Sequence, residues 1–201
     1  MERNKRQQMI ELARHVGILR PRDLTRHGLP AEYLHQFTQQ GLMQRVGRGL
    51  YRLADGEPGA HQSLLEACAQ VPHGVLCLLT ALRYHELTTQ APSEIWMALE
   101  ANAWHPISTD LSLHIVRFSG EVFHSGIEEH TVDGVTLRVY SLAKTVTDCF
   151  KYRNKIGIDV ALEALREGWR TRRVSMTDLW FFAKIDRIAN VMRPYLEMVS
   201  S

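Results

Sequence analysis

The sequence predicts an α+β protein: an N-terminal winged helix-turn-helix over residues 1–54, a linker at 55–60, and a larger α+β domain with a small sheet and several helices over residues 61–201. Three observations support this prediction. Residues 1–54 combine helical periodicity with two short alternating segments around a glycine-rich turn. A cluster of breaker residues, Asp55-Gly56-Glu57-Pro58-Gly59, follows. Beyond it, strand-length apolar segments are interspersed with amphipathic helical segments.

Composition and charge are those of a globular protein with two unlike parts. Of 201 residues, 45% are hydrophobic and 23% are charged, so disorder is not expected. Residues 1–54 carry ten Lys/Arg and four Asp/Glu, a net charge of +6; because the whole chain carries +2, the remainder carries −4. A basic module joined to an acidic body favours a polyanion-binding module, with an ordinary solvated basic surface as the alternative.

Cysteine and histidine usage gives no support for a metal or cofactor. Cys68, Cys77 and Cys149 are odd in number and form no CxxC pair, which predicts buried thiols in a reducing compartment. The ten histidines are scattered, with His124 and His130 flanking an expected turn. A polar N-terminus and the lack of an apolar run of about 18 residues predict a cytoplasmic protein with no membrane partner.

Two helices are expected first. Residues 5–15 place Met9, Ile10, Leu12, Ala13 and Val16 at helical spacing, and Gly17 ends that helix. A second, short helix from Arg20 to His27 has Pro21 in its first turn and buries Leu24. Gly28 is expected to close it in the left-handed conformation, which leaves only a tight turn before the third helix, as in a helix-turn-helix.

The third helix is expected over residues 30–40. One side carries Ala31, Leu34 and Phe37, with Tyr33 at its flank, and the opposite side carries Glu32, His35, Gln36 and Gln39. Glutamine can meet adenine with two hydrogen bonds, so this face suits base reading in the major groove. Exposed glutamines are also common on helices that bind nothing.

A hairpin is expected next. Its first strand alternates, with Leu42, Gln44 and Val46 on one face and Met43 and Arg45 on the other. A Gly47-Arg48-Gly49 turn then leads to a second strand at 50–53. Arginines on such a hairpin can hold phosphates or enter the minor groove, and arginines on the second helix can contact phosphate. The predicted DNA-contacting residues are Arg20, Arg22, Arg26, Glu32, Tyr33, His35, Gln36, Gln39, Arg45, Arg48 and Arg52.

The body is expected to alternate helices with strands. The expected helices are 61–70, 75–87, 142–153, 158–169 and one or two over 179–199, after a segment beginning at Met176. The expected strands are 95–99, 113–118 and a hairpin over 127–140 with Asp133-Gly134 at its turn. Ser141 is expected to cap a helix rather than to act as a nucleophile, and no Walker, GxGxxG or GxSxG motif is present.

One polar run in the body stands out; it comprises Lys144, Asp148, Lys151, Arg153, Asn154, Lys155 and Asp159. The i,i+4 spacing of Lys144 and Asp148 predicts a surface ion pair worth only a few tenths of a kcal/mol. Lys151, Arg153 and Lys155 can form a second anion-binding patch, or simply a solvated helix end.

Two segments of the sequence, one in the basic N-terminal region and one around the polar run, resemble a known protein family. A basic winged helix ending in RVGRGLYRLAD, followed by YSLAKTVTDCFKYRNKIGIDVALEALREGW, resembles the AbiEi antitoxins of type IV toxin–antitoxin systems. The resemblance implies an autorepressor that binds inverted repeats at its own promoter as double-stranded DNA. It also implies a C-terminal domain that counteracts a cognate nucleotidyltransferase-like toxin without a tight complex, with the seven residues of the polar run as candidates for that role.

Two other functions remain open. One is a nucleic-acid- or nucleotide-processing enzyme with its site in the 141–160 polar run, where Asp148 and Asp159 would have to meet to hold Mg²⁺. The other is a structural adaptor whose body only dimerises. The expectation drawn from the residues and the resemblance is a chain that is not an enzyme and has neither catalytic residues nor a cofactor.

Overall fold

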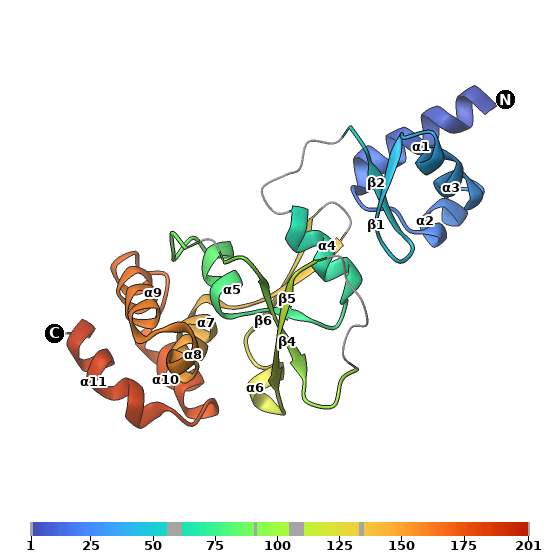
Figure 1. Cartoon of the computed structure of the whole chain (residues 1–201). Helices are drawn as coiled ribbons and strands as arrows, with labels where there is room; N and C mark the ends of the chain where they lie inside the picture. Colours follow the sequence, from blue (N-terminus) through green and yellow to red (C-terminus); the bar gives the residue numbers. More distant parts are fainter. Residues whose placement is uncertain (1, 56–61, 91, 105–110, 133–134, 201) are drawn as a thin grey trace. The chain divides into compact units, whose positions relative to one another are not determined.

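A computed structural model describes residues 2–55, 62–90, 92–104, 111–132 and 135–200, and the side chains from residue 5 onward. The chain is α+β, as predicted from the sequence. It divides into two compact units, the first made mainly of Met1–Pro72 and the second of most of the chain from His73 onward (Figure 1). Each unit has its own apolar core.

The first unit begins with three helices and a hairpin. These elements are α1 (Glu2–Val16), α2 (Pro21–Arg26), α3 (Glu32–Gln39), β1 (Met43–Gly47) and β2 (Leu50–Leu53). The predicted helices are therefore confirmed, with bounds shifted by a few residues. Their core consists of fully or nearly fully buried side chains, namely Met9, Ala13, Leu19, Leu24, Leu29, Leu34, Phe37 and Met43. Burying each large aliphatic side chain contributes about 1.5–3 kcal/mol, so this stripe defines how the three helices pack.

Two details of this region differ from the prediction. The helix α3 starts at Glu32, after Ala31 as its N-cap residue, and Ala31 is exposed instead of belonging to the apolar face. The reason is that Ala31 precedes the first helical turn, where the chain has not yet reached the core. Gly28 has a φ of +69°, as expected for a left-handed cap after α2.

The hairpin is antiparallel, and its turn is the dipeptide Arg48-Gly49, with Gly49 at a φ of +71°. The predicted strict alternation along β1 is wrong, because Met43 and Val46 are both buried. A register shift between Arg45 and Gly47 marks a bulge, and a bulge breaks the two-residue period of a strand. Tyr51 of β2 also exchanges backbone hydrogen bonds with Leu19, at 2.7 and 3.0 Å.

The helix α4 (Gln62–Gln70) clusters with the first unit. Its buried side chains are Leu65, Ala67, Cys68 and Ala69, and the Gln70 amide donates to the Val46 carbonyl of β1 at 2.6 Å. The predicted linker lies almost wholly outside the described residues, as does His61, the expected start of this helix. The predicted domain boundaries therefore stay a prediction, although the compact unit extends to Pro72.

A second sheet follows in the chain. Within the described residues its strands are β3 (Val75–Leu76), β4 (Ile95–Glu100), β5 (Leu113–Phe118), β6 (Ile127–Val132) and β7 (Val135–Tyr140). Their order is β5-β4-β3-β7-β6. The strand β4 runs parallel to β5 and antiparallel to β3, and β3 is parallel to β7. The strands predicted at 95–99 and 113–118 are confirmed, and β6 and β7 are neighbours as expected. The predicted turn at Asp133-Gly134 lies outside the described residues.

The predicted helix over residues 75–87 is wrong in its first part. Val75 and Leu76 form β3 and pair with Ala98 and Met97 of β4, and the helix α5 (Leu78–Tyr84) begins only after Cys77. A short apolar run buried on all sides looks alike in a central strand and in a core helix, so periodicity does not separate them. Pairing with the neighbouring strands β4 and β7 is what makes Val75-Leu76 a strand.

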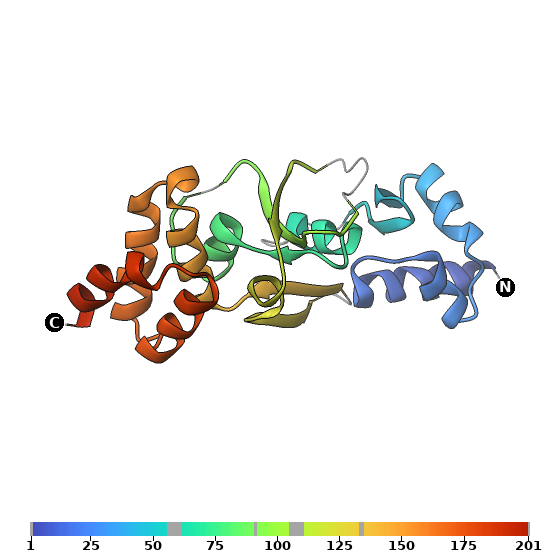
Figure 2. The same ribbon diagram turned by 90° about the horizontal axis from the view of Figure 1, so that it is seen from below.

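Helices gather after the sheet. They are α7 (Leu142–Lys151), α8 (Arg153–Ile156), α9 (Ile158–Arg170), α10 (Met176–Ile185) and α11 (Ala189–Ser200), with α6 (Glu121–His124) between β5 and β6. Figures 1 and 2 both show α9, α10 and α11 side by side near the C-terminus. The Ser141 hydroxyl accepts from the Lys144 backbone N–H, which confirms Ser141 as the cap of α7. None of the helices in the described part of the chain has the length and apolar character needed to span a membrane.

Candidate functional site

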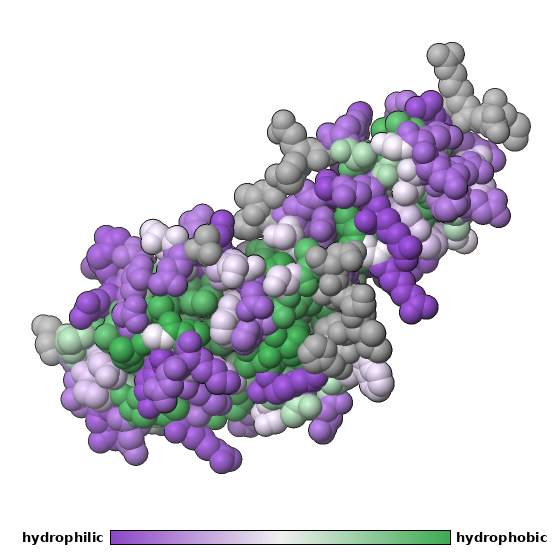
Figure 3. Space-filling model, viewed as in Figure 1, coloured by the Kyte–Doolittle hydropathy of each residue, from purple (hydrophilic) through white to green (hydrophobic). Residues whose placement is uncertain are grey.

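The outward face of α3 carries polar side chains. Glu32, His35, Gln36 and Gln39 are exposed, and the Gln39 amide nitrogen lies 3.1 Å from His35 Nε2. Leu34 on the opposite face is buried, so the helix presents its amides away from the core. On the side of the molecule drawn in Figure 3, hydrophilic side chains dominate the first unit.

Tyr33 differs from the other predicted α3 contacts. Its ring stacks on Phe37 with 5.8 Å between centroids and 14° between planes, and it packs against the core. The side chain is half-buried. Tyr33 therefore supports the flank of α3 and is less available at the surface than the polar residues of that helix.

Most of the predicted arginines are available at the surface. Arg22, Arg26, Arg45 and Arg48 are exposed, with Arg48 in the turn of the hairpin. The Arg45 Nε donates to the Gly47 carbonyl at 3.1 Å, and the Arg22 Nε lies 4.0 Å from the Asp23 carboxylate. A surface pair of this kind contributes little energy, so Arg22 keeps its charge available for another anion.

Arg20 and Arg52 are less exposed than these arginines. Arg20 is half-buried before α2, and its backbone N–H donates to the Asp23 carboxylate at 2.8 Å. The Arg52 side chain is 21% exposed; its Nη2 donates to Gln44 Oε1 at 2.8 Å and its Nε lies 3.6 Å from Glu66 Oε1. The Arg52 guanidinium is therefore already in contact with two side chains of the first unit, Gln44 and Glu66.

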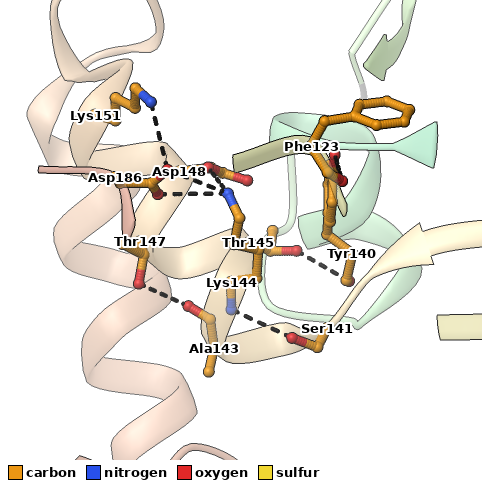
Figure 4. Close-up of polar contacts among 10 residues, drawn as sticks. All are labelled: Phe123, Tyr140, Ser141, Ala143, Lys144, Thr145, Thr147, Asp148, Lys151 and Asp186. Carbon is orange, nitrogen blue, oxygen red and sulfur yellow. Dashed lines mark hydrogen bonds and ion pairs between the residues drawn. The ribbon is translucent and has the colours of Figure 1, made fainter. Parts of the chain in front are cut away.

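The polar run of the body holds a buried charge cluster (Figure 4). Lys144 and Asp148 on α7 form an ion pair with both side chains fully buried, and Lys144 Nζ also lies 3.4 Å from each carboxylate oxygen of Asp186, where α10 ends. The predicted surface ion pair is therefore wrong. An i,i+4 spacing gives the same signal on any face of a helix, and here that face points into the core.

Aromatic rings and a second lysine complete the cluster. The Lys144 ammonium lies 5.1 Å from the centroid of the Phe118 ring and 5.0 Å from that of Tyr140, a distance suited to cation–π attraction. The Tyr140 hydroxyl donates to the Phe123 carbonyl at 2.8 Å, which fixes that ring. Lys151, whose side chain is 30% exposed, lies 3.4 Å from Asp186 Oδ1 and brings the cluster towards the surface.

Burial controls the proton affinity of this cluster. Desolvation raises the pKa of Asp148 well above its ordinary value; the Lys144 charge opposes this shift, and the Asp186 charge adds to it. The Asp148 Oδ2 atom is buried without a hydrogen-bond partner among the described residues. Desolvation, together with the Asp148 charge, also raises the pKa of the Cys149 thiol and of Tyr152, the latter to about 12.

The rest of the polar run lies elsewhere. The Arg153 guanidinium donates to the Phe150 carbonyl at 2.9 Å near the end of α7, and the Lys155 ammonium sits 5.5 Å from the centroid of the Tyr152 ring. Asn154 and Asp159 are exposed. The run thus falls into two sets of residues: a buried cluster on α7, and a second set at α8 and the start of α9 in which Arg153 is half-buried and the other three residues are exposed.

Two acidic residues in these sites were not predicted. Asp186 lies 42 positions beyond Lys144 and is one of several charged residues in a terminal segment that is apolar for most of its length, so the sequence does not single it out. Glu66, the partner of Arg52, has no signal at all, because the pairing of α4 with the hairpin is a tertiary contact. Among the described residues, no group of three or more His, Cys, Asp and Glu side chains could hold a metal ion, and all three cysteines are buried free thiols.

Comparison with protein families gives a match over the first part of the chain. Residues 7–54, which span α1 to β2, match the family model described as "Transcriptional regulator, AbiEi antitoxin". A comparison with curated protein sequences finds no match. The motif over residues 140–170 lies outside the matched range, so its assignment to antitoxin function stays a prediction. Through residues 7–54 the chain is thus similar to AbiEi antitoxins that act as transcriptional regulators, which confirms the resemblance expected from the sequence.

Proposed function

We propose that this protein is a DNA-binding transcriptional autorepressor and the antitoxin of a type IV toxin–antitoxin system. It binds inverted repeats at its own promoter and counteracts a nucleotidyltransferase-like toxin. The observation that carries the first half of this proposal is the pairing of an exposed, amide-rich face on α3 with an exposed arginine, Arg48, in the turn of the adjacent hairpin. The family match over residues 7–54 supports the same conclusion.

In this proposal residues 1–54 are a winged helix-turn-helix. Gln36 and Gln39 read base edges in the major groove, where an amide can pair with the N6 and N7 atoms of adenine. Arg48 and Arg45 hold the phosphate backbone or the minor groove, and Arg22 and Arg26 contact phosphate beside α2. Because the exposed face of α3 carries no lysine or arginine, the arginines elsewhere supply most of the affinity and the amides supply the sequence preference.

A gel-shift assay with the full-length protein tests DNA binding. The probe is the DNA upstream of the protein's own reading frame, and the control is a scrambled duplex of the same length and composition. We expect tighter binding to the promoter fragment than to the scrambled duplex, and equal affinity for the two would contradict sequence-specific repression. Footprinting of an inverted repeat then shows whether a dimer or two cooperating monomers fill it.

We assign the antitoxin role to the second unit. The part of the polar run that a toxin, or an anion bound by the toxin, could meet is the exposed set Asn154, Lys155 and Asp159 together with the half-buried Arg153. Lys144 and Asp148 are fully buried and serve this role only by shaping the unit. The test is co-expression with a nucleotidyltransferase-like toxin: if a neighbouring reading frame encodes one, this protein should restore growth, without stable co-purification of the two proteins. Growth arrest that persists despite confirmed expression would refute the antitoxin assignment.

An enzymatic function makes a different prediction. A Mg²⁺-dependent nuclease built on the polar run needs accessible carboxylates, whereas Asp148 is buried against Lys144. We therefore propose that the protein lacks such activity. Turnover of nucleic acid or nucleotides by purified protein with Mg²⁺, abolished by Asp148→Ala, would reverse this conclusion.

A further inference from the structure

The β1–β2 hairpin is held from one side by α4, which lies beyond the part of the chain that matches the AbiEi model. Gln70 on α4 donates its amide to the Val46 carbonyl at 2.6 Å, at the register shift of β1. The contact is close: a Cβ added at Gly47 would lie 3.0–3.1 Å from the side-chain atoms of Gln70. A residue larger than glycine at position 47 would therefore push against the Gln70 side chain.

A second contact joins α4 to the other strand of the hairpin. Glu66 Oε1 lies 3.6 Å from Arg52 Nε, and both side chains are mostly buried, at 14% and 21% exposure. The Gln62 amide donates to the same Glu66 oxygen at 2.9 Å, which orients the carboxylate. The Arg52 guanidinium also donates to Gln44 across the hairpin. One acidic residue of α4 thus neutralises one arginine of the predicted DNA-binding set.

We propose that α4 positions the hairpin for DNA, with Gln70 fixing the bulge before the Arg48 turn and Glu66 withholding the charge of Arg52. This inference rests on the proposed DNA-binding function. Gln70 and Glu66 are positioning residues, since they act through Arg48 and Arg52. The DNA-binding part of the chain accordingly extends to the end of α4, and Arg52 contributes to the form of the hairpin instead of to phosphate contact.

Full-length variants test the first contact by equilibrium binding to the promoter fragment over a salt series. Gln70→Ala and Gly47→Ala should each weaken binding about fivefold, the effect of one lost hydrogen bond. Each should also reduce the slope of log K against log salt by about one, because Arg48 loses its phosphate. The double variant should bind no worse than Gln70→Ala alone, because alanine at position 70 leaves space for the new methyl group.

Glu66→Gln tests the second contact. It should strengthen binding and steepen the salt slope by about one, since the Arg52 charge is no longer neutralised. Glu11→Gln is the matched control: Glu11 also accepts from a glutamine four residues earlier, at 3.0 Å, but it lies on the exposed face of α1. The control should leave the slope unchanged.

A merely structural role for α4 would lower the thermal unfolding midpoint and leave the salt slope of the folded protein at the wild-type value. Unchanged slopes in Gln70→Ala, Gly47→Ala and Glu66→Gln, with wild-type protein bound to the promoter, would overturn this inference and leave the proposed function standing. Failure of the wild-type protein to bind the promoter would overturn the proposed function, and this inference with it.

Discussion

Lys144 of α7 and Asp186 at the end of α10, 42 residues apart, meet in the interior of the second unit, with Nζ 3.4 Å from both carboxylate oxygens. Both side chains are fully buried, and Asp148 shares the same ammonium. Removing charges from water is expensive, so such a cluster is tolerated only when every member keeps a partner. The cluster therefore joins α7 to the end of α10, since separating them would take Asp186 away from Lys144.

Replacing Lys144 should be strongly destabilising. Lys144→Met keeps the length of the side chain but leaves Asp148 and Asp186 buried side by side, and breaking a buried pair in this way costs about 3–5 kcal/mol. Chemical denaturation measures the change in the free energy of unfolding. Lys155→Met, at an exposed lysine beside Tyr152, is the control and should stay within about 0.5 kcal/mol of wild type. Equal effects of the two changes would contradict the buried cluster.

The free energy of unfolding should depend on pH through the titration of Asp148. Its folded-state pKa is raised above the ordinary carboxyl value of 3.8, chiefly by desolvation, so the folded state binds this proton more tightly than the unfolded state does. The stabilising contribution is complete below that ordinary value and is lost as the pH rises through the folded-state pKa, at up to about 1.4 kcal/mol per pH unit.

The comparison that isolates this effect is with Asp148→Asn, which cannot ionise at this position. The unfolding free energy of wild type minus that of Asp148→Asn should fall as the pH is raised from 4 towards 8. A difference that grows over the same range would mean that Lys144 holds the pKa of Asp148 below its ordinary value.

Gly126 should not tolerate a side chain. Its φ is +75°, and an added Cβ would lie 2.9 Å from Phe182 Cζ and 3.0 Å from the Lys144 Cβ. Gly126→Ala should therefore cost about 1–3 kcal/mol from overpacking, in addition to backbone strain. Gly120→Ala isolates the packing effect, since Gly120 also has a positive φ, +54°, but an added Cβ meets nothing within 4 Å. Similar thermal midpoints for the two variants would refute the contact with Phe182.

Arg48 should supply affinity that does not depend on sequence. Arg48→Ala is expected to weaken binding to promoter and scrambled DNA by similar factors and to reduce the salt slope by about one. Arg193→Ala, which removes the same charge from an exposed position on α11, is the control. Binding competition over a salt series measures both slopes, and an unaltered slope for Arg48→Ala would remove the hairpin turn from the DNA interface.

Gln36 should supply sequence preference. Gln36→Ala is expected to relax the preference at one or two base positions, with a cost of about 1–3 kcal/mol at the promoter and a smaller cost on scrambled DNA. Gln8→Ala, at an exposed glutamine on α1, controls for loss of an amide from the same unit. Selection of binding sites from a randomised operator measures the change. If the selected sequences are the same for Gln36→Ala and wild type, Gln36 does not read bases.

The sequence predicts the first unit well because its information is local. Helical spacing from Met9 to Val16, the glycine cap at Gly28 and the Arg48-Gly49 turn each depend on neighbouring residues, and each is present in the structure. The prediction misses the bulge in β1, since the burial of Val46 follows from the register shift and not from alternation. The exposed residues of α3 could be predicted for the same local reason.

The second unit is predicted less well where contacts are distant in the chain. Val75-Leu76 is apolar enough for a helix, and only its pairing with β4 and β7 makes it a strand. The residues of the polar run could be identified, but their separation into a buried cluster and a more exposed set could not. That separation depends on which face of α7 meets α10.

By itself, then, the sequence determined the α+β class, the order of most helices and strands, the exposed amides of α3 and the resemblance to AbiEi antitoxins, because local spacing and composition encode these. Only the tertiary structure decided that Lys144 and Asp148 are core residues joined by Asp186, and that Glu66 holds Arg52. An ion pair between residues far apart in the chain leaves no periodic signal, and whether a charge is buried depends on what the rest of the chain packs against it.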